Sequence, residues 1–86
     1  MKVERAGGNR VRLLLIEDDT RLVEALRQQL RDAGFAVDVS SDGVEGLYLG
    51  EEFPIDLAII DLGLPELPGL EVLRKLRSRG RAFPIL

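Results

Sequence analysis

Three acidic residues in this 86-residue chain could act together on a metal ion and a phosphoryl group. Glu17 and Asp18 follow the apolar run "VRLLLI" at residues 11–16, and Asp61 closes the run "IDLAIID" at residues 55–61. Carboxylate oxygens are ligands that Mg²⁺ prefers, together with water and phosphate oxygens. Mg²⁺ beside a carboxylate can orient a phosphoryl group, and an Asp can accept that group as an aspartyl phosphate. The three acids therefore form a candidate phosphoryl site.

This chemistry requires that the acids come from the ends of neighbouring strands. Residues 11–16 and 55–61 have the nearly continuous apolar pattern of strands that are covered on both faces. Residues 35–40, "FAVDVS", alternate between apolar and polar positions, which is typical of a strand nearer a sheet edge. An isolated Asp at a strand end is commonly a helix cap or a solvated loop residue. Two apolar strands that both end in acids favour a shared site instead.

Amphipathic segments separate these strands. "DDTRLVEALRQQLRDAG" predicts a helix that Asp19 or Thr20 caps and that Gly34 closes. "SDGVEGLYLGEEF" predicts a weaker helix, because Asp42 can cap its start but Gly46 lowers the helix propensity of its interior.

"LEVLRKLRSRG" predicts a third helix that ends at Gly80, with a Glu71–Lys75 pair at i, i+4. Its apolar face is expected to consist of Leu70, Leu73 and Leu76. "FPIL", at residues 83–86, then begins another apolar run. The alternation of strands and helices predicts a doubly wound parallel sheet with right-handed crossovers. The two most apolar strands should be neighbours, about 4.8 Å apart, with their acids at one edge of the sheet.

The composition limits what else the chain can do. It has 45% hydrophobic and 31% charged residues, as expected for one small globular domain. Its net charge of −3 disfavours direct nucleic-acid binding. The absence of Cys and His excludes disulfides and thiolate or imidazole sites, and suits a cytoplasmic protein. Residues 1–10 are expected to be a flexible tail without a signal peptide, and no segment is long enough to span a membrane.

"LLLIEDD" and "IDLAIIDLGLPELPGLEVLRKLR" resemble the receiver domain of bacterial two-component response regulators, most closely the OmpR/PhoB type. The resemblance covers residues 11–86 and implies a flavodoxin-like (CheY-like) fold. By position, it makes Asp61 the phosphoacceptor, Asp18 a direct Mg²⁺ ligand, and Glu17 an acid that holds the ion through water. Gly63 matches the residue that offers a backbone carbonyl to the metal, and Pro65 the proline of the following loop.

The resemblance also implies partners. In the family a sensor histidine kinase supplies the phosphoryl group, and full-length OmpR/PhoB-type members carry a winged-helix DNA-binding domain after the receiver. The family's Thr or Ser at the end of the fourth strand, and its Lys at the end of the fifth, would both come after Leu86. We therefore expect an incomplete sheet of three strands plus the start of a fourth. Such a chain should either self-associate, with strand exchange as one route, or be loosely folded. Such a chain is a phosphoacceptor and not an enzyme in the ordinary sense.

Three alternatives stand beside this interpretation. The chain could be an interaction or dimerisation fragment that cannot be phosphorylated. A nucleotide or flavin binder would need a glycine-rich loop after the first strand, where "EDDT" places acids. The basic run "RKLRSRGR", at residues 74–81, could bind DNA, but cations in the last turn of a helix are usually a solvated match to the helix dipole.

Overall fold

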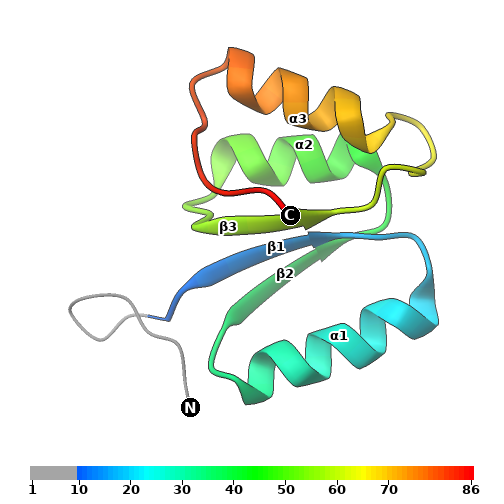
Figure 1. Ribbon diagram of the computed structural model, residues 1–86, viewed down its shortest axis with the longest axis vertical. Helices are drawn as coiled ribbons and strands as arrows, with labels where there is room; N and C mark the ends of the chain where they lie inside the picture. The colour runs from blue at the N-terminus through cyan, green and yellow to red at the C-terminus, as the bar shows by residue number, and fades with distance from the viewer. Residues whose placement is uncertain (1–9) are drawn as a thin grey trace.

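The computed structural model describes residues 10–86, in which strands and helices alternate (Figure 1). The elements are β1 (Arg12–Ile16), α1 (Thr20–Asp32), β2 (Ala36–Ser40), α2 (Gly43–Glu52), β3 (Leu57–Ile60) and α3 (Gly69–Ser78). The predicted flexible tail, residues 1–10, lies outside the described residues except for Arg10. Asp19 and Asp42 cap α1 and α2 as predicted, and Gly34 and Gly80 lie just beyond α1 and α3 with positive φ.

The three strands form one parallel sheet in the order β2-β1-β3, so the two most apolar strands are neighbours as predicted. A fourth segment begins at the outer edge of β3, where Ile85 forms a parallel bridge to Ala58. The Ala58 N–H donates to the Pro84 carbonyl at 2.9 Å, and the Leu86 N–H donates to the Ala58 carbonyl at 2.8 Å. The fold is therefore the predicted incomplete flavodoxin-like α/β sheet.

β3 is shorter than the predicted strand, which ran over residues 55–61. The Ile55 N–H donates to the Phe53 carbonyl at 2.8 Å, which is a tight turn and not a strand contact. At the other end, the Asp61 N–H still donates to the Ile16 carbonyl of β1 at 2.9 Å. The chain then leaves the sheet, so Asp61 begins a loop whose first residue is tied to β1.

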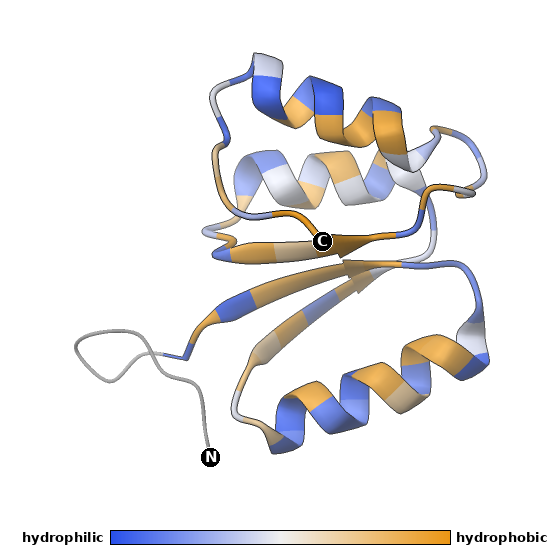
Figure 2. Cartoon of the chain, viewed as in Figure 1, coloured by the Kyte–Doolittle hydropathy of each residue, from blue (hydrophilic) through white to orange (hydrophobic). Residues whose placement is uncertain are grey.

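Each face of the sheet packs against helices (Figures 1 and 2). On one face, Leu14, Ile16, Ala58 and Ile60 pack with residues of α3, and the face is also covered by α2. On the other face, Leu13 and Leu15 pack against Val23 of α1. The strands present apolar side chains to both layers, which explains their continuous apolar pattern. No helix in the described part of the chain is long and apolar enough to cross a bilayer.

The glycines of α2 allow this helix to pack closely against its neighbours. A Cβ at Gly46 would lie 2.4 Å from Cδ1 of Ile16, and one at Gly50 would lie 2.9 Å from Cδ2 of Leu76. Both separations are too short for a carbon–carbon contact, whose optimum is about 3.5–4.0 Å. The sequence predicted only that Gly46 weakens the helix. The structure adds the reason for a small residue there, which is the close approach of α2 to β1 and α3.

The buried face of α3 differs from the predicted one. Val72 and Leu76, one turn apart, are fully buried, whereas Leu70 is 48% exposed. The predicted pair between Glu71 and Lys75 is also wrong, because Glu71 pairs with Arg74 at 2.8 Å. A three-residue spacing places a charged pair on one side of a helix as well as a four-residue spacing does.

The loop between β3 and α3 contains a strained turn. Glu66 has a φ of 68°, and the Leu67 N–H donates to the Pro65 carbonyl at 2.8 Å across it. This is a γ-turn with positive φ, a rare conformation. Among the described non-glycine residues, Glu66 alone has a positive φ.

We predict that Glu66→Gly raises the free energy of unfolding by roughly 0.5–1 kcal/mol. Left-handed backbone costs a non-glycine residue about 1–2 kcal/mol, and part of this gain is offset by the larger entropy of an unfolded glycine. Urea midpoints of the two proteins measure the difference. Glu66→Ala is the control, because alanine keeps the Cβ that causes the strain, and an equal gain from both variants would contradict the prediction.

Candidate metal and phosphoryl-transfer site

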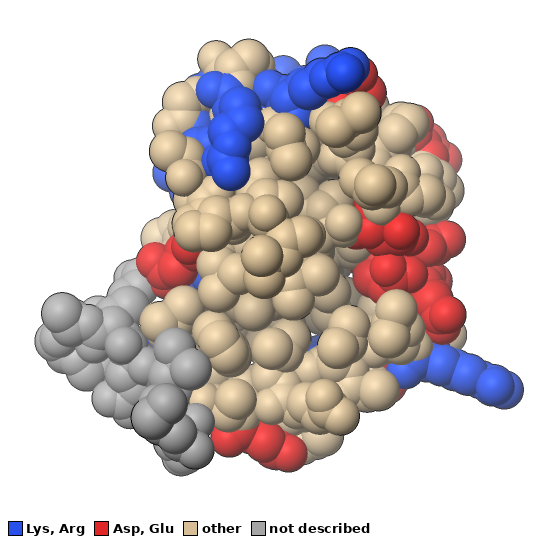
Figure 3. Space-filling model, in the orientation of Figure 1, with Lys and Arg blue, Asp and Glu red and all other residues tan. Residues whose placement is uncertain are grey.

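The carboxyl ends of the strands bring the predicted acids to one edge of the sheet. Glu17 and Asp18 directly follow β1, and Asp61 directly follows β3. The Glu17 N–H donates to the carbonyl of Ser40, the last residue of β2, at 3.0 Å. With the bond from the Asp61 N–H to Ile16, all three strand ends are connected. Acidic side chains accordingly gather where β1 and β3 end, at the right of Figure 3.

Glu17, Asp18 and Asp61 each offer one carboxylate oxygen, and these oxygens all lie within 4.8 Å of one another. Glu17 and Asp61 are half-buried and Asp18 is exposed. Three negative charges in this space repel one another unless a cation lies between them. The oxygen-only donor set suits a hard cation such as Mg²⁺ better than a metal that prefers nitrogen or sulfur. The residues present therefore fit the predicted ion.

Backbone amides hold two of these carboxylates. The Gly63 N–H donates to Asp61 Oδ1 at 3.2 Å, and the Asp19 N–H donates to Glu17 Oε1 at 3.1 Å. Gly63 thus lies at the site, but the contact seen is made by its amide, and the role predicted for its carbonyl stays a prediction. Asp19, the other acid of "EDD", accepts hydrogen bonds from the Arg21 and Leu22 amides as the cap of α1.

The acidic neighbourhood raises the pKa of Glu17. The main cause is burial, which disfavours the charged carboxylate, and the charges of Asp61, Asp18 and Asp19 add to it. The hydrogen bond from the Asp19 amide acts in the opposite direction, because it stabilises the charged form. Near neutral pH, the ionised Glu17 is therefore an electrostatic cost in the absence of a cation.

We predict that Glu17→Gln stabilises the metal-free protein near neutral pH and does so much less at about pH 4. The folded state holds the Glu17 proton more tightly than the unfolded state does. The Glu17 carboxyl thus contributes fully to the free energy of unfolding at pH values below its pKa in the unfolded chain. This contribution is lost as the pH rises through its higher pKa in the folded protein. Urea unfolding in a chelator at the two pH values tests this, and equal gains at both would contradict it.

Sequence reasoning missed two glycines beside the site. A Cβ at Gly69, the first residue of α3, would lie 2.1 Å from the Asp61 carbonyl oxygen. A Cβ at Gly43, the first residue of α2, would lie 1.9 Å from the Leu67 carbonyl oxygen. The "DG" and "PG" dipeptides before the two helices were the only available signal, and they are also common in ordinary turns.

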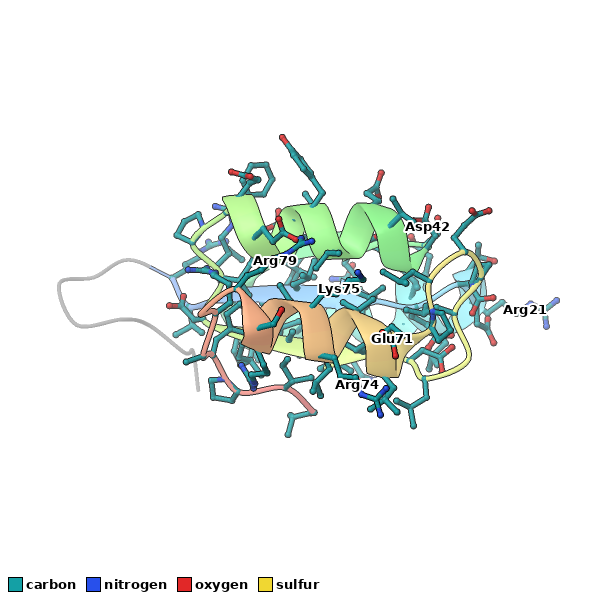
Figure 4. The ribbon with its side chains drawn as sticks, turned by 90° about the horizontal axis from the view of Figure 1, so that it is seen from above. Arg21, Asp42, Glu71, Arg74, Lys75 and Arg79 are labelled. Atoms are coloured by element: carbon teal, nitrogen blue, oxygen red, sulfur yellow. The ribbon has the colours of Figure 1, made fainter. Side chains whose placement is uncertain are left out.

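The arginines of the basic run bind mainly within the protein. Arg81 donates to the carbonyls of Gly50 and Phe53, both at 3.0 Å, and lies over the Phe83 ring. Arg79 pairs with Glu51 of α2, and Arg74 pairs with Glu71 (Figure 4). The contacts of Arg79 and Arg81 connect the end of α3 to α2, and the Arg74 pair lies within α3, so they favour a structural role for the run over DNA binding.

Comparison with known proteins identifies the family and the fold of the chain. A sequence model described as the response regulator receiver domain matches residues 13–86. The chain belongs to the response regulator receiver family. The matched range begins within β1 and includes all the other strands and helices of the described chain.

Curated relatives place this receiver among OmpR/PhoB-family regulators, as the resemblance implied. It is 46% identical over 76 residues to the two-component response regulator PhoP of Pseudomonas aeruginosa, covering 88% of this chain and 34% of PhoP. It is 43% identical over 76 residues to the response regulator MprA of Mycobacterium sp. strain KMS, covering 88% of this chain and 33% of MprA. The receiver therefore spans about a third of the length of these relatives.

Solved structures confirm the CheY-like fold. A CheY-like receiver from Methanospirillum hungatei matches with a TM-score of 0.85 and 28% identity, over 90% of this chain and 62% of that one. A second match is the receiver of the sensor histidine kinase PA1611 from Pseudomonas aeruginosa, which has a magnesium ion coordinated in its active-site cleft. Its TM-score is 0.85 and its sequence identity 27%, over 88% of this chain and 64% of that one. The complex of the histidine kinase ThkA with the response regulator TrrA matches with a TM-score of 0.79 and 30% identity, over 86% of this chain and 64% of the matched chain.

Proposed function

We propose that this receiver accepts a phosphoryl group on Asp61 with the help of Mg²⁺. The observation that carries the proposal is the group of three carboxylate oxygens, from Glu17, Asp18 and Asp61, within 4.8 Å of one another. Asp18 and Asp61 would hold the ion directly, Glu17 would hold it through water, and Gly63 would contribute its carbonyl. Mg²⁺ coordinated in the cleft of the PA1611 receiver supports this assignment.

The residues of this chain suggest how the transfer would proceed. The Gly63 amide binds Asp61 Oδ1, which leaves Oδ2 as the oxygen that attacks phosphorus. As the new P–O bond forms, the bond from phosphorus to the donor breaks, and the leaving group keeps the electron pair. When bound, Mg²⁺ supplies the positive charge that neutralises the phosphoryl oxygens beside the carboxylates. The chain positions the group that is transferred, and its own Asp61 is modified.

The donor that we propose is a sensor histidine kinase. The complex of ThkA with the response regulator TrrA, to which this chain is similar, supports that partner. In such a transfer the P–N bond of a phosphohistidine breaks, and the imidazole nitrogen that is released takes up a proton. The chain has no His of its own to serve as donor. Control of a DNA-binding output domain in the cytoplasm is part of the same proposal. The transcriptional regulatory protein CusR of Escherichia coli, to which this chain is 38% identical, supports the role in transcription.

Self-association belongs to this proposal as well. The central part of the face seen in Figure 3 has few charged side chains, and Leu86 and Leu62 are 77% and 69% exposed. Exposed apolar surface of this kind favours association. Strand exchange has less support, because residues 84–86 already bind the outer edge of β3. Light scattering at several protein concentrations tests the proposal, and a monomer throughout would contradict it.

The direct test of the function is incubation with a small acyl phosphate and Mg²⁺, followed by intact mass measurement. A single phosphoryl adduct that depends on Mg²⁺ is the expected result. Omission of the metal, with a chelator present, is the control. Mg²⁺ binding without any adduct would overturn the phosphoacceptor role and favour the alternative, an interaction fragment that cannot be phosphorylated.

A further inference from the structure

We propose that Gly69 and Gly43 are positioning residues for the phosphoacceptor. They hold the two ends of the loop that runs from Asp61 to α3, and so fix the direction of the Asp61 carboxylate. This inference rests on the function proposed for Asp61. Neither glycine belongs to the group of carboxylates that could hold the ion, so both would act through the loop backbone that they contact.

Gly69 holds the end of the loop nearer to Asp61. A Cβ at Gly69 would lie 2.1 Å from the Asp61 carbonyl oxygen and 2.9 Å from the carbonyl carbon. The Gly69 N–H also donates to the Leu62 carbonyl at 3.3 Å. Gly69 is buried and its φ is not positive, so glycine is needed here for space and not for an unusual backbone conformation. The first residue of α3 therefore lies directly against the backbone of the phosphoacceptor.

Gly43 holds the far end of the loop. A Cβ there would lie 1.9 Å from the Leu67 carbonyl oxygen and 2.8 Å from Leu67 Cβ. The Gly43 N–H points to the Pro65 carbonyl at 3.5 Å. Asp42, which caps α2 through the Glu45 amide, fixes the position of this helix start (Figure 4). The loop thus lies against the starts of two helices.

A shift of this loop would change the site, because the site is connected to the loop at two points. The Gly63 amide, inside the loop, donates to Asp61 Oδ1 at 3.2 Å. The Asp61 amide donates to the Ile16 carbonyl at 2.9 Å, which ties the residue to β1 on the other side. We expect a displaced loop to pull on the Asp61 carboxylate through the Gly63 amide while the Asp61 amide stays bound to β1, and so to change the direction of the carboxylate.

The size of the displacement decides the expected effect. The nearest atoms to a Cβ at Gly69 or Gly43 are backbone carbonyl atoms, which cannot move aside as a side-chain end does. Restoring an allowed contact of about 3 Å at Gly69 requires a shift of roughly 1 Å. Misplacing a reacting group by about 1 Å can lower a reaction rate by about 100-fold.

The test compares Gly69→Ala and Gly43→Ala with the matched control Gly50→Ala. The three atoms nearest to a Cβ at Gly50 would be side-chain ends of Leu76 and Leu14, which belong to α3 and β1 and not to the loop. All three changes add one methyl group to a buried helical glycine. For each protein we would measure the rate of phosphoryl uptake from a small acyl phosphate, the affinity for Mg²⁺ alone by calorimetry, and the urea midpoint.

We expect uptake to fall about 10- to 100-fold, and Mg²⁺ affinity to fall several-fold, in folded Gly69→Ala and Gly43→Ala. Gly50→Ala should keep both within about twofold, whatever its urea midpoint. Uptake that falls only in proportion to the folded fraction would overturn the inference. If a variant is unfolded in buffer, the same rates are measured in trimethylamine oxide, which favours the compact state. A wild-type protein that takes up no phosphoryl group would instead refute the proposed function itself.

Discussion

Asp61→Asn is expected to abolish phosphoryl uptake from a small acyl phosphate while the protein stays folded. The amide has nearly the same shape as the carboxylate and can still accept a hydrogen bond from the Gly63 amide at its oxygen. It lacks the negative oxygen that attacks phosphorus, so no adduct should form at any Mg²⁺ concentration. Removing one of three neighbouring charges should also relieve repulsion at the sheet edge. We therefore expect an equal or higher urea midpoint together with complete loss of the adduct.

Intact mass measurement after a timed reaction decides this prediction. Asp32→Asn is a suitable control, because Asp32 is an exposed residue at the end of α1, and its side chain accepts a hydrogen bond from the Gln28 side chain. The control should be modified at the wild-type rate. An adduct on the Asp61→Asn protein would show that a different residue is the acceptor, and peptide mapping would locate it.

Asp18→Asn is expected to lower the affinity for Mg²⁺ by at least about tenfold, and phosphoryl uptake with it. Even residues that only support a metal ligand cost about 10- to 100-fold in affinity when they are changed, so a direct ligand should cost at least as much. Asp18 is exposed, and its side chain packs against no core. The loss should therefore appear in metal binding and not in the urea midpoint of the metal-free protein. High Mg²⁺ concentrations should restore part of the uptake, and a chelator should abolish it.

The neighbouring acid provides the control for this second prediction. Asp19 caps α1 through the Arg21 and Leu22 amides, and asparagine is as good a helix cap as aspartate. Asp19→Asn should therefore change Mg²⁺ affinity by less than about threefold. Calorimetric titration of both variants with Mg²⁺ makes the comparison. Equal losses in the two proteins would mean that only the total negative charge matters, and would contradict a specific role for Asp18.

The site residues could be predicted because they are acidic and stand directly after apolar runs in the sequence. Two apolar runs that both end in acids specify neighbouring parallel strands and a shared edge, and the structure brings Glu17, Asp18 and Asp61 together there. Helix caps such as Asp19 and Asp42 could be predicted as well, since a capping side chain binds amides within three residues of its own position.

Features that depend on contacts between distant segments could not be predicted. Gly69 and Gly43 are needed because backbone from the β3–α3 loop approaches them, and no local pattern reports that approach. The buried face of α3 was assigned to its leucines. In the structure, the side of α3 that faces the sheet and α2 carries Val72, and Leu70 is exposed. The predicted β3 was too long, because Ile55 is apolar and continues the strand pattern in the sequence, although it lies in a turn in the structure.

The close fit of α2 has a consequence for how the chain folds. Its ten residues include Gly43, Gly46 and Gly50, and each interior glycine lowers helix stability by roughly 1 kcal/mol relative to alanine. α1, by contrast, has thirteen residues and no glycine. An isolated segment with the sequence of α2 would therefore be unstructured in water, and the helix can persist only after β1 and α3 are in place to contact it. Since the start of α2 contacts the β3–α3 loop, we expect the acidic edge to acquire its final shape late in folding.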